Sequence, residues 1–117
     1  MDSKSLKLAR QFLGKKITVT IDRKLGSKHP EWDFEYLVNY GYIDGVIAPD
    51  GEGLDVYLLK VDVPVDTCKG IVVAIVHRLD DDDDKLVVLP KGETISDAEI
   101  ETQVEFQEKW LKHQIIR

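Results

Sequence analysis

The sequence feature that most limits the fold of this chain is the run Gly-Ile-Val-Val-Ala-Ile-Val at residues 70–76. The run is much shorter than the roughly 18–20 apolar residues that a membrane-spanning helix needs. Because no polar side chain interrupts it, the run is predicted to be a central strand that is buried on both faces.

Several other segments have the patterns of short strands. Residues 16–22 alternate and are rich in β-branched side chains, and alternation also extends over 35–43 and 54–63. A short apolar run at 86–89 ends at Pro90 and is predicted to be a further strand. Short strands of this kind in one chain predict a small barrel or a strongly curved sheet.

Two helices are predicted towards the ends of the chain. The first is short and amphipathic, begins near a serine that can cap it, and runs to Leu13 before Gly14. Ser96 followed by Glu99 is a capping-box pattern, which predicts a second helix that continues to Leu111. Both helices are expected to pack outside the strands.

Composition limits the classes of function. The chain of 117 residues is expected to be a single domain spanning 1–117, because no linker or repeat divides it. Its formal net charge of −6 argues against general nucleic-acid binding, which usually needs a basic face. The sole cysteine, Cys68, allows no intrachain disulfide, and there is no secretory pattern. We therefore expect a cytoplasmic protein that binds neither nucleic acid nor membranes.

Clustered carboxylates are the clearest candidates for chemistry. Asp50, Glu52 and Asp55 lie within one glycine-rich turn, and a run of five aspartates at 80–84 precedes Lys85. Because Mg²⁺ prefers carboxylate, water and phosphate oxygens, the two groups are predicted to face each other and to hold divalent metal ions. The predicted ligands are Asp50, Asp55, Asp80 and Asp83. The alternative without metal binding is that both groups are solvated acidic turns, since Asp-Gly turns are common in hairpins.

Groups that can bind phosphate accompany these carboxylates. Tyr36 and Tyr40 share one face of a predicted strand, and Arg23 opens the basic segment 23–30. Arg23 offers a bidentate guanidinium, Lys85 a point charge and the tyrosines hydroxyl donors. The alternative is that the tyrosines are half-buried sheet residues and the basic segment is an exposed loop.

Taken together, the motifs resemble the soluble family I inorganic pyrophosphatases, in a short and divergent bacterial form. The resemblance is carried by Asn-Tyr-Gly-Tyr-Ile at 39–43, by Asp-Gly-Glu-Gly-Leu-Asp at 50–55, and by the acidic loop that ends in Asp-Asp-Lys before an apolar strand and Pro90. The similarity covers residues 16–112 and is strongest over 36–90.

The resemblance implies an OB-like β-barrel and the hydrolysis of inorganic pyrophosphate to two phosphates by a metal-activated water. It implies Mg²⁺ as cofactor, with Mn²⁺ as a possible substitute, and a homo-oligomeric assembly. The implied catalytic residues are Glu52 as proton acceptor, Asp50, Asp55 and Lys85. The implied metal ligands are again Asp50, Asp55, Asp80 and Asp83. Lys85, Tyr40 and Tyr36 would contact phosphate, and Arg23, which is out of register with the family's arginine, is assigned to substrate binding by its charge.

The chain also departs from the family pattern. Glu52 and Gly53 stand where the family has Asp and Pro, Thr20 stands where it has Glu, and the acidic loop is shorter. The extra methylene of Glu52 would move the proton acceptor by about 1 Å, a shift that can cost about a hundredfold in rate. The alternative function is therefore a catalytically weak module that binds metal or phosphate, or a hydrolase of another phosphate compound on the same fold.

Overall fold

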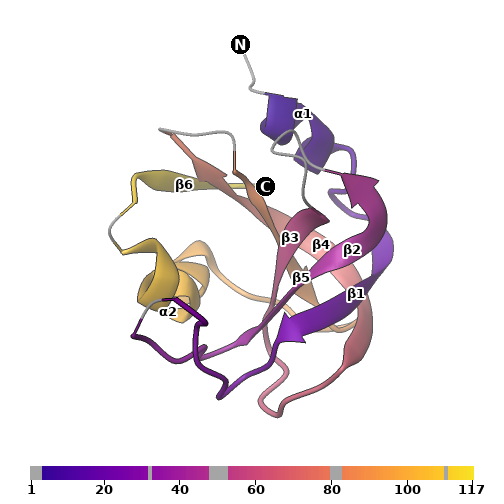
Figure 1. Cartoon of the computed structure of the whole chain (residues 1–117). Coiled ribbons are helices and arrows are strands. Elements are labelled where there is room, and N and C mark those ends of the chain that lie inside the picture. Colours follow the sequence, from indigo (N-terminus) through magenta and orange to yellow (C-terminus); the bar gives the residue numbers. More distant parts are fainter. Residues whose placement is uncertain (1–3, 32, 48–52, 80–82, 110) are drawn as a thin grey trace.

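The computed structural model describes residues 4–31, 33–47, 53–79, 83–109 and 111–117 (Figure 1). In these ranges the secondary-structure elements are α1 (Lys4–Arg10), β1 (Lys16–Arg23), β2 (Asn39–Ile47), β3 (Gly53–Leu58), β4 (Thr67–Arg78), β5 (Lys85–Leu89), α2 (Asp97–Glu108) and β6 (His113–Ile116).

A closed barrel forms the centre of the fold. Its strands pair in the order β1, β2, β3, β5, β4, and β1 also pairs with β4, which closes the circle. The β3–β5 pair is parallel, the other pairs are antiparallel, and β6 extends the sheet from β4. The expectation of a mainly β, OB-like barrel with two helices packed outside is confirmed.

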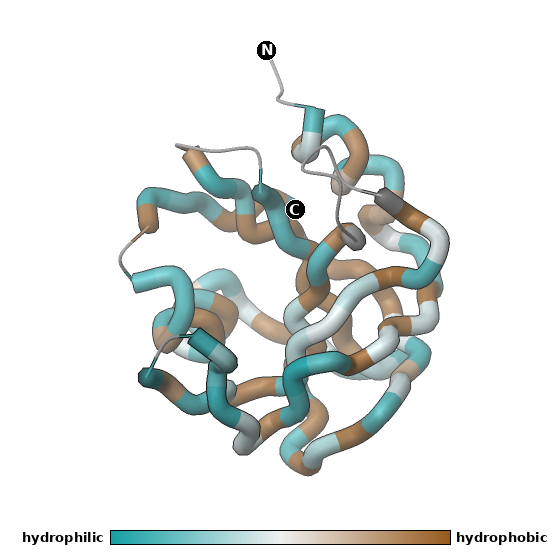
Figure 2. Tube along the Cα trace, in the orientation of Figure 1, coloured by the Kyte–Doolittle hydropathy of each residue, from teal (hydrophilic) through white to brown (hydrophobic). Residues whose placement is uncertain are grey.

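Alternation along the strands separates two hydrophobic clusters, one inside the barrel and one outside it. Leu54, Val56 and Leu58 of β3 belong to the interior cluster, whereas Tyr57 and the following Leu59 belong to the outer cluster. Figure 2 shows that hydrophobic residues recur along the strands of the barrel. β4 contributes to both clusters, as predicted for a central strand that is buried on both faces.

A β-bulge decides which side chains of β4 face outward. The register with β5 shifts between Val72 and Ala74, so Val73 is an extra residue in the strand. Val72 and Ile75 lie in the interior cluster, whereas Ala74 lies in the outer cluster. The bulge therefore exchanges the two faces for the rest of the strand, and Arg78 at its end lies on the outer face.

The two helices cover different parts of the barrel (Figure 1). α1 adds Leu6 and Ala9 to the interior cluster, whereas α2 adds Ile100 to the outer cluster. The first helix was expected to reach Leu13, but it ends at Arg10 and continues as a turn. Within the described ranges, no helix is both long and apolar enough to cross a bilayer.

The prediction for α2 is right at its start and wrong at its end. Ser96 is the N-cap, and its hydroxyl accepts a hydrogen bond from the backbone N–H of Glu99 at 3.1 Å, which confirms the capping box. The helix ends at Glu108 and not at Leu111, because the chain turns back there to form β6 beside β4. β6 is not predicted, since its four residues are too few to show a clear alternation.

The strand predicted at 35–43 is wrong in its first part. Tyr36 pairs with the preceding loop: Gly26 N–H donates to the carbonyl of Tyr36 at 2.8 Å, and Tyr36 N–H donates to the carbonyl of Ser27 at 2.8 Å. These bonds satisfy the backbone of Tyr36 away from the barrel. The strand therefore begins only at Asn39.

Two other strand boundaries differ from the prediction. The strand expected at 54–63 ends at Leu58, because Lys60 adopts a φ of 64° that an extended strand does not allow. β4 begins at Thr67, before the predicted start at residue 70, because its first residues pair with β1.

Gly41 marks a close approach of β1 and β2, where the absence of a side chain lets the two backbones come together. A Cβ atom on Gly41 would overlap the carbonyl oxygen of Thr20. We predict that Gly41→Ala lowers the free energy of unfolding by about 2–3 kcal/mol, because the two backbones must move apart. Urea denaturation measures this difference. Thr18→Ala, at an exposed position of β1, should change it by less than about 0.5 kcal/mol, and an equally small effect of Gly41→Ala would contradict the prediction.

Candidate functional site

Lys85 lies at the centre of the candidate site. It is the first residue of β5, and the parallel register that places Val56 opposite Leu86 also brings Lys85 beside Asp55 on the outer face. The ammonium nitrogen of Lys85 lies 3.1 Å from Oδ2 of Asp55 and 3.1 Å from Oδ1 of Asp83, and its side chain is only 3% exposed. Two predicted metal ligands from distant parts of the sequence therefore meet on one buried cation.

Two tyrosines extend the site along the outer face. The ring centroids of Tyr36 and Tyr40 are 5.5 Å apart, and the nitrogen of Lys85 lies 5.6 Å from the centroid of the Tyr40 ring. Burial raises the pKa of Tyr40 well above its usual value, and the charges of Asp55 and Asp83 and a hydrogen bond with Asp55 raise it further. The Tyr40 hydroxyl therefore stays protonated at neutral pH.

Tyr36 is more deeply buried than expected for a side chain that binds phosphate from solvent. Its residue surface is only 2% exposed, because it packs into a cluster of six aromatic rings. The cluster consists of His29, Phe34, Tyr36, Tyr40, Tyr57 and Phe106. Burial raises the pKa of Tyr36, and the charge of Arg23, which also hydrogen-bonds with Tyr36, acts in the opposite direction. Arg23 therefore reaches the site beside Tyr36.

Asp22 is a further carboxylate near the site, and the sequence analysis did not single it out as a site residue. Partial desolvation raises its pKa, the charge of Arg23 opposes this rise, and the charge of Asp55 adds to it. Asp22 thus lies within electrostatic reach of Asp55. The available signal was its position at the end of the alternating segment 16–22, where a carboxylate follows β-branched residues.

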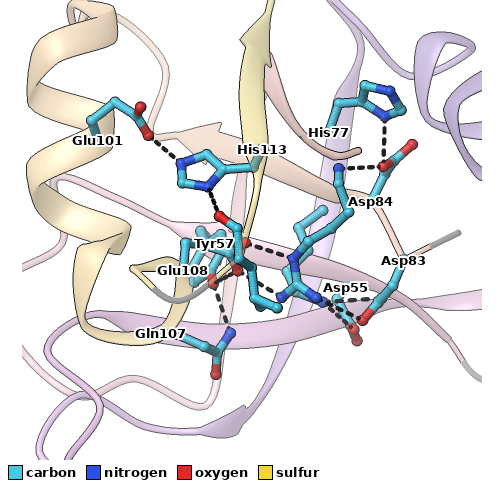
Figure 3. A network of polar contacts seen from close by, with 12 residues as sticks. Asp55, Tyr57, His77, Asp83, Asp84, Glu101, Gln107, Glu108 and His113 are labelled. Carbon is cyan, nitrogen blue, oxygen red and sulfur yellow. Dashed lines mark hydrogen bonds and ion pairs between the residues drawn. The ribbon is translucent and has the colours of Figure 1, made fainter. Parts of the chain in front are cut away.

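A buried ion pair connects the site with the C-terminal end of α2 (Figure 3). Nε and Nη2 of Arg78 donate to the two carboxylate oxygens of Glu108 at 2.6 and 2.8 Å. The hydroxyl of Tyr57 donates to Glu108 at 2.6 Å and accepts from the side-chain amide of Gln107 at 2.6 Å. On its other side, Nη1 of Arg78 lies 3.6 Å from Oδ2 of Asp83. One polar network therefore runs from α2 to Asp83.

Both members of this ion pair remain charged. Burial by itself raises the pKa of Glu108, but the hydrogen bonds from Arg78 and Tyr57 outweigh it, so the pKa is lowered. Burial also disfavours the charged form of Arg78, but its contacts with Glu108 outweigh this effect and raise its pKa. The sequence analysis did not assign either residue to the site. An arginine two residues after the buried apolar run 70–76 was the available signal, because a buried charge needs a partner.

A histidine fastens β6 to α2 (Figure 3). Nε2 of His113 lies 2.6 Å from the carboxylate of Glu101, and Nδ1 lies 2.9 Å from the carbonyl oxygen of Leu111. Partial burial lowers the pKa of His113, but these two contacts outweigh it and raise the pKa. The protonated imidazole, which donates from both nitrogens, is therefore favoured at this joint.

His77 lies on the other face of β4 and contacts Asp84. Nδ1 of His77 is 2.9 Å from Oδ1 of Asp84, and the same oxygen accepts the backbone N–H of Arg78 at 2.9 Å. The side chain of Asp84 is completely buried. This contact holds the start of β5 against the end of β4.

Only two of the four predicted metal ligands, Asp55 and Asp83, lie within the described residues. Asp50, Glu52 and Asp80 lie outside the described residues. Within the described ranges, no three His, Cys, Asp or Glu side chains converge as a metal site. Asp55 and Asp83 offer two carboxylates that are 29% and 37% exposed. Mg²⁺ commonly takes one or two carboxylates together with waters and phosphate oxygens, so this pair fits the ion.

Comparison with known proteins identifies the fold. No protein-family model matches the chain, and no curated protein matches it. The solved structure of inorganic pyrophosphatase from Ehrlichia chaffeensis is similar, with a TM-score of 0.67 and 17% identity over 86% of this chain and 84% of that chain. The enzyme from Helicobacter pylori gives a TM-score of 0.67 and 16% identity over 87% and 84% of the two chains, and that from Neisseria gonorrhoeae 0.61 and 24% over 77% and 70%. The chain therefore has the fold of these bacterial proteins.

We predict that Glu108→Gln lowers the free energy of unfolding at pH 7 by about 3 kcal/mol, because the buried charge of Arg78 loses the carboxylate to which it donates two hydrogen bonds. Since the pKa of Glu108 is lowered, its contribution is complete above the ordinary glutamate pKa of 4.5 and is lost as the pH falls through its own lower pKa.

Urea denaturation of the wild type and the Glu108→Gln variant between pH 7 and pH 3 checks this prediction. The difference in stability should be constant down to about pH 4.5 and narrow below it. Glu105→Gln, an exposed position on the same helix, is the matched control and should differ little from the wild type. A difference that stays constant over the whole pH range would contradict the ionised state of Glu108.

Proposed function

We propose that this protein hydrolyses inorganic pyrophosphate to two phosphates, with Mg²⁺ as its cofactor. The observation that carries the proposal is the convergence of the predicted site residues within the described part of the chain. These residues are Arg23, Tyr36, Tyr40, Asp55, Asp83 and Lys85. A fold alone leaves function open, so the proposal depends on this site and takes the similar solved structures as support.

Asp55 and Asp83, together with Asp50 and Asp80, would hold the metal ions. When bound, Mg²⁺ would offset phosphate charge and lower the pKa of a coordinated water. Lys85 supplies a fixed positive charge beside Asp55 and Asp83, so an anionic substrate can approach these carboxylates in spite of the acidic chain.

The chain's own groups would bind the phosphate oxygens and accept the proton. Tyr40, whose hydroxyl stays protonated because its pKa is raised, would donate a hydrogen bond, and Lys85 and Arg23 would add charge-assisted ones. The oxygen of the attacking water would bond to one phosphorus while the bond from that phosphorus to the bridging oxygen breaks. The second phosphate would leave with the bridging oxygen, and Glu52 would accept the proton of the water.

The first prediction from this proposal is metal-dependent release of phosphate from pyrophosphate by the purified protein. Release should occur with Mg²⁺ and with Mn²⁺, stop with chelator, and fall by about 100-fold or more in Asp55→Asn, which removes a ligand charge. Asp66→Asn, which alters a carboxylate that is 83% exposed, should retain full activity. Folded wild-type protein that releases no phosphate with either metal would refute the proposal and leave a binding module or another phosphate substrate.

The second prediction separates substrate binding from metal binding. Lys85→Met should raise KM for pyrophosphate by about tenfold, because one charge-assisted contact to phosphate is lost. The same variant should bind Mn²⁺ at least as tightly as the wild type, because Asp55 and Asp83 lose a competing cation. Steady-state kinetics and calorimetric titration with Mn²⁺ in the absence of substrate measure the two effects. Loss of Mn²⁺ binding in this variant would contradict the assigned role of Lys85.

A further inference from the structure

We propose that Arg78 is a positioning residue that fixes Asp83 for metal binding and that Glu108 of α2 holds Arg78 for this task. The inference deepens the proposed function and rests on it, because it takes Asp83 as a metal ligand. In this arrangement the end of α2, which contributes no group to the phosphate or the metal, sets the orientation of a ligand on the barrel.

The support behind Asp83 is rigid. Glu108 has no exposed surface and Arg78 is 8% exposed. The guanidinium donates two parallel hydrogen bonds to Glu108, a geometry that leaves it little freedom to rotate. The hydroxyl of Tyr57 fixes Glu108 from β3. Residues of α2 and β3 therefore fix the guanidinium of Arg78 on the side away from Asp83.

Arg78 also contacts two consecutive residues of the acidic loop, Asp83 and Asp84. Its Nη1 atom lies 3.6 Å from Oδ2 of Asp83, while its backbone N–H donates to Oδ1 of Asp84 at 2.9 Å. Lys85 contacts the other oxygen of Asp83. The two carboxylate oxygens of Asp83 thus face two different cations, and this arrangement restricts the rotation of a carboxylate that is 37% exposed.

The charges of Arg78 and Glu108 largely cancel each other near Asp83. A lone arginine beside Asp83 would repel a metal ion, but the buried carboxylate of Glu108 compensates the charge of Arg78 at hydrogen-bond distance. The Arg78–Glu108 pair has little net charge, but it still offers a hydrogen-bond donor to Asp83. It can therefore orient the Asp83 carboxylate without repelling a metal ion. Contacts of this kind around a metal ligand typically change metal affinity by about 10–100-fold when they are removed.

A thermodynamic cycle on metal binding tests the proposal. Arg78→Met/Glu108→Gln removes both charges together, so no unpaired charge remains buried. Calorimetric titration with Mn²⁺ alone should show a Kd about tenfold higher than that of the wild type. In an Asp83→Asn background, the same double substitution should change Kd by less than about twofold, because its effect passes through Asp83.

The matched control is a second pair of opposite charges, which joins α2 to the segment after β3. Lys60 and Glu99 form an exposed ion pair at 2.9 Å, and Lys60→Met/Glu99→Gln should leave the Kd for Mn²⁺ unchanged. Circular dichroism and urea denaturation establish that every variant is folded. An equal loss of affinity in both Asp83 backgrounds, or no loss in either, would overturn the positioning role.

Phosphate release from pyrophosphate, measured on the same preparations, separates this inference from the proposed function. Wild-type protein that binds Mn²⁺ and shows the coupled cycle but releases no phosphate would refute the pyrophosphatase proposal and retain the positioning of Asp83. Phosphate release together with an equal change in Kd in both Asp83 backgrounds would support the pyrophosphatase proposal and refute the positioning of Asp83. Absence of Mn²⁺ binding by the folded wild type would overturn the inference itself.

Discussion

One buried ammonium group determines how this site is built. An unpaired charge in the position of Lys85 would cost several kcal/mol, so Asp55 and Asp83 must remain where they compensate it. The parallel pairing of β3 with β5 brings Lys85 to Asp55. Two carboxylates that would otherwise repel each other are therefore gathered by a residue of the chain itself, and the barrel folds with its acidic groups already close together.

The parts of the molecule that the sequence predicts are those with local signals. The apolar run at 70–76 predicts a strand that is buried on both faces, because no polar side chain interrupts it. The capping box at Ser96 depends on contacts within one helical turn. The sequence motifs predict that the two acidic groups face each other, but they contain neither the strand register nor the ion pair of Lys85 with Asp55 and Asp83.

The parts that the sequence does not predict depend on contacts between distant residues. Arg78 and Glu108 are thirty positions apart, and neither has a neighbour in the sequence that indicates its partner. Tyr36 follows the alternation of a strand, but its backbone binds the loop before it. β6 forms a strand because its backbone pairs with β4. The roles of Asp50, Glu52 and Asp80 stay predictions, because these residues lie outside the described part of the chain.

The bulge at Val73 has a consequence for how this chain can vary. In a regular strand, Arg78 would share the face of Val72 and point into the barrel, and His77 would take the outer position. The single extra residue exchanges the two. Deleting one residue between the bulge and the end of β4, with the bulge kept, would turn Arg78 to the inner face and bring Leu79 to the position that Arg78 now occupies. Homologous chains should therefore tolerate substitutions in this stretch more readily than changes of its length, and the count of residues there is itself a determinant of the site.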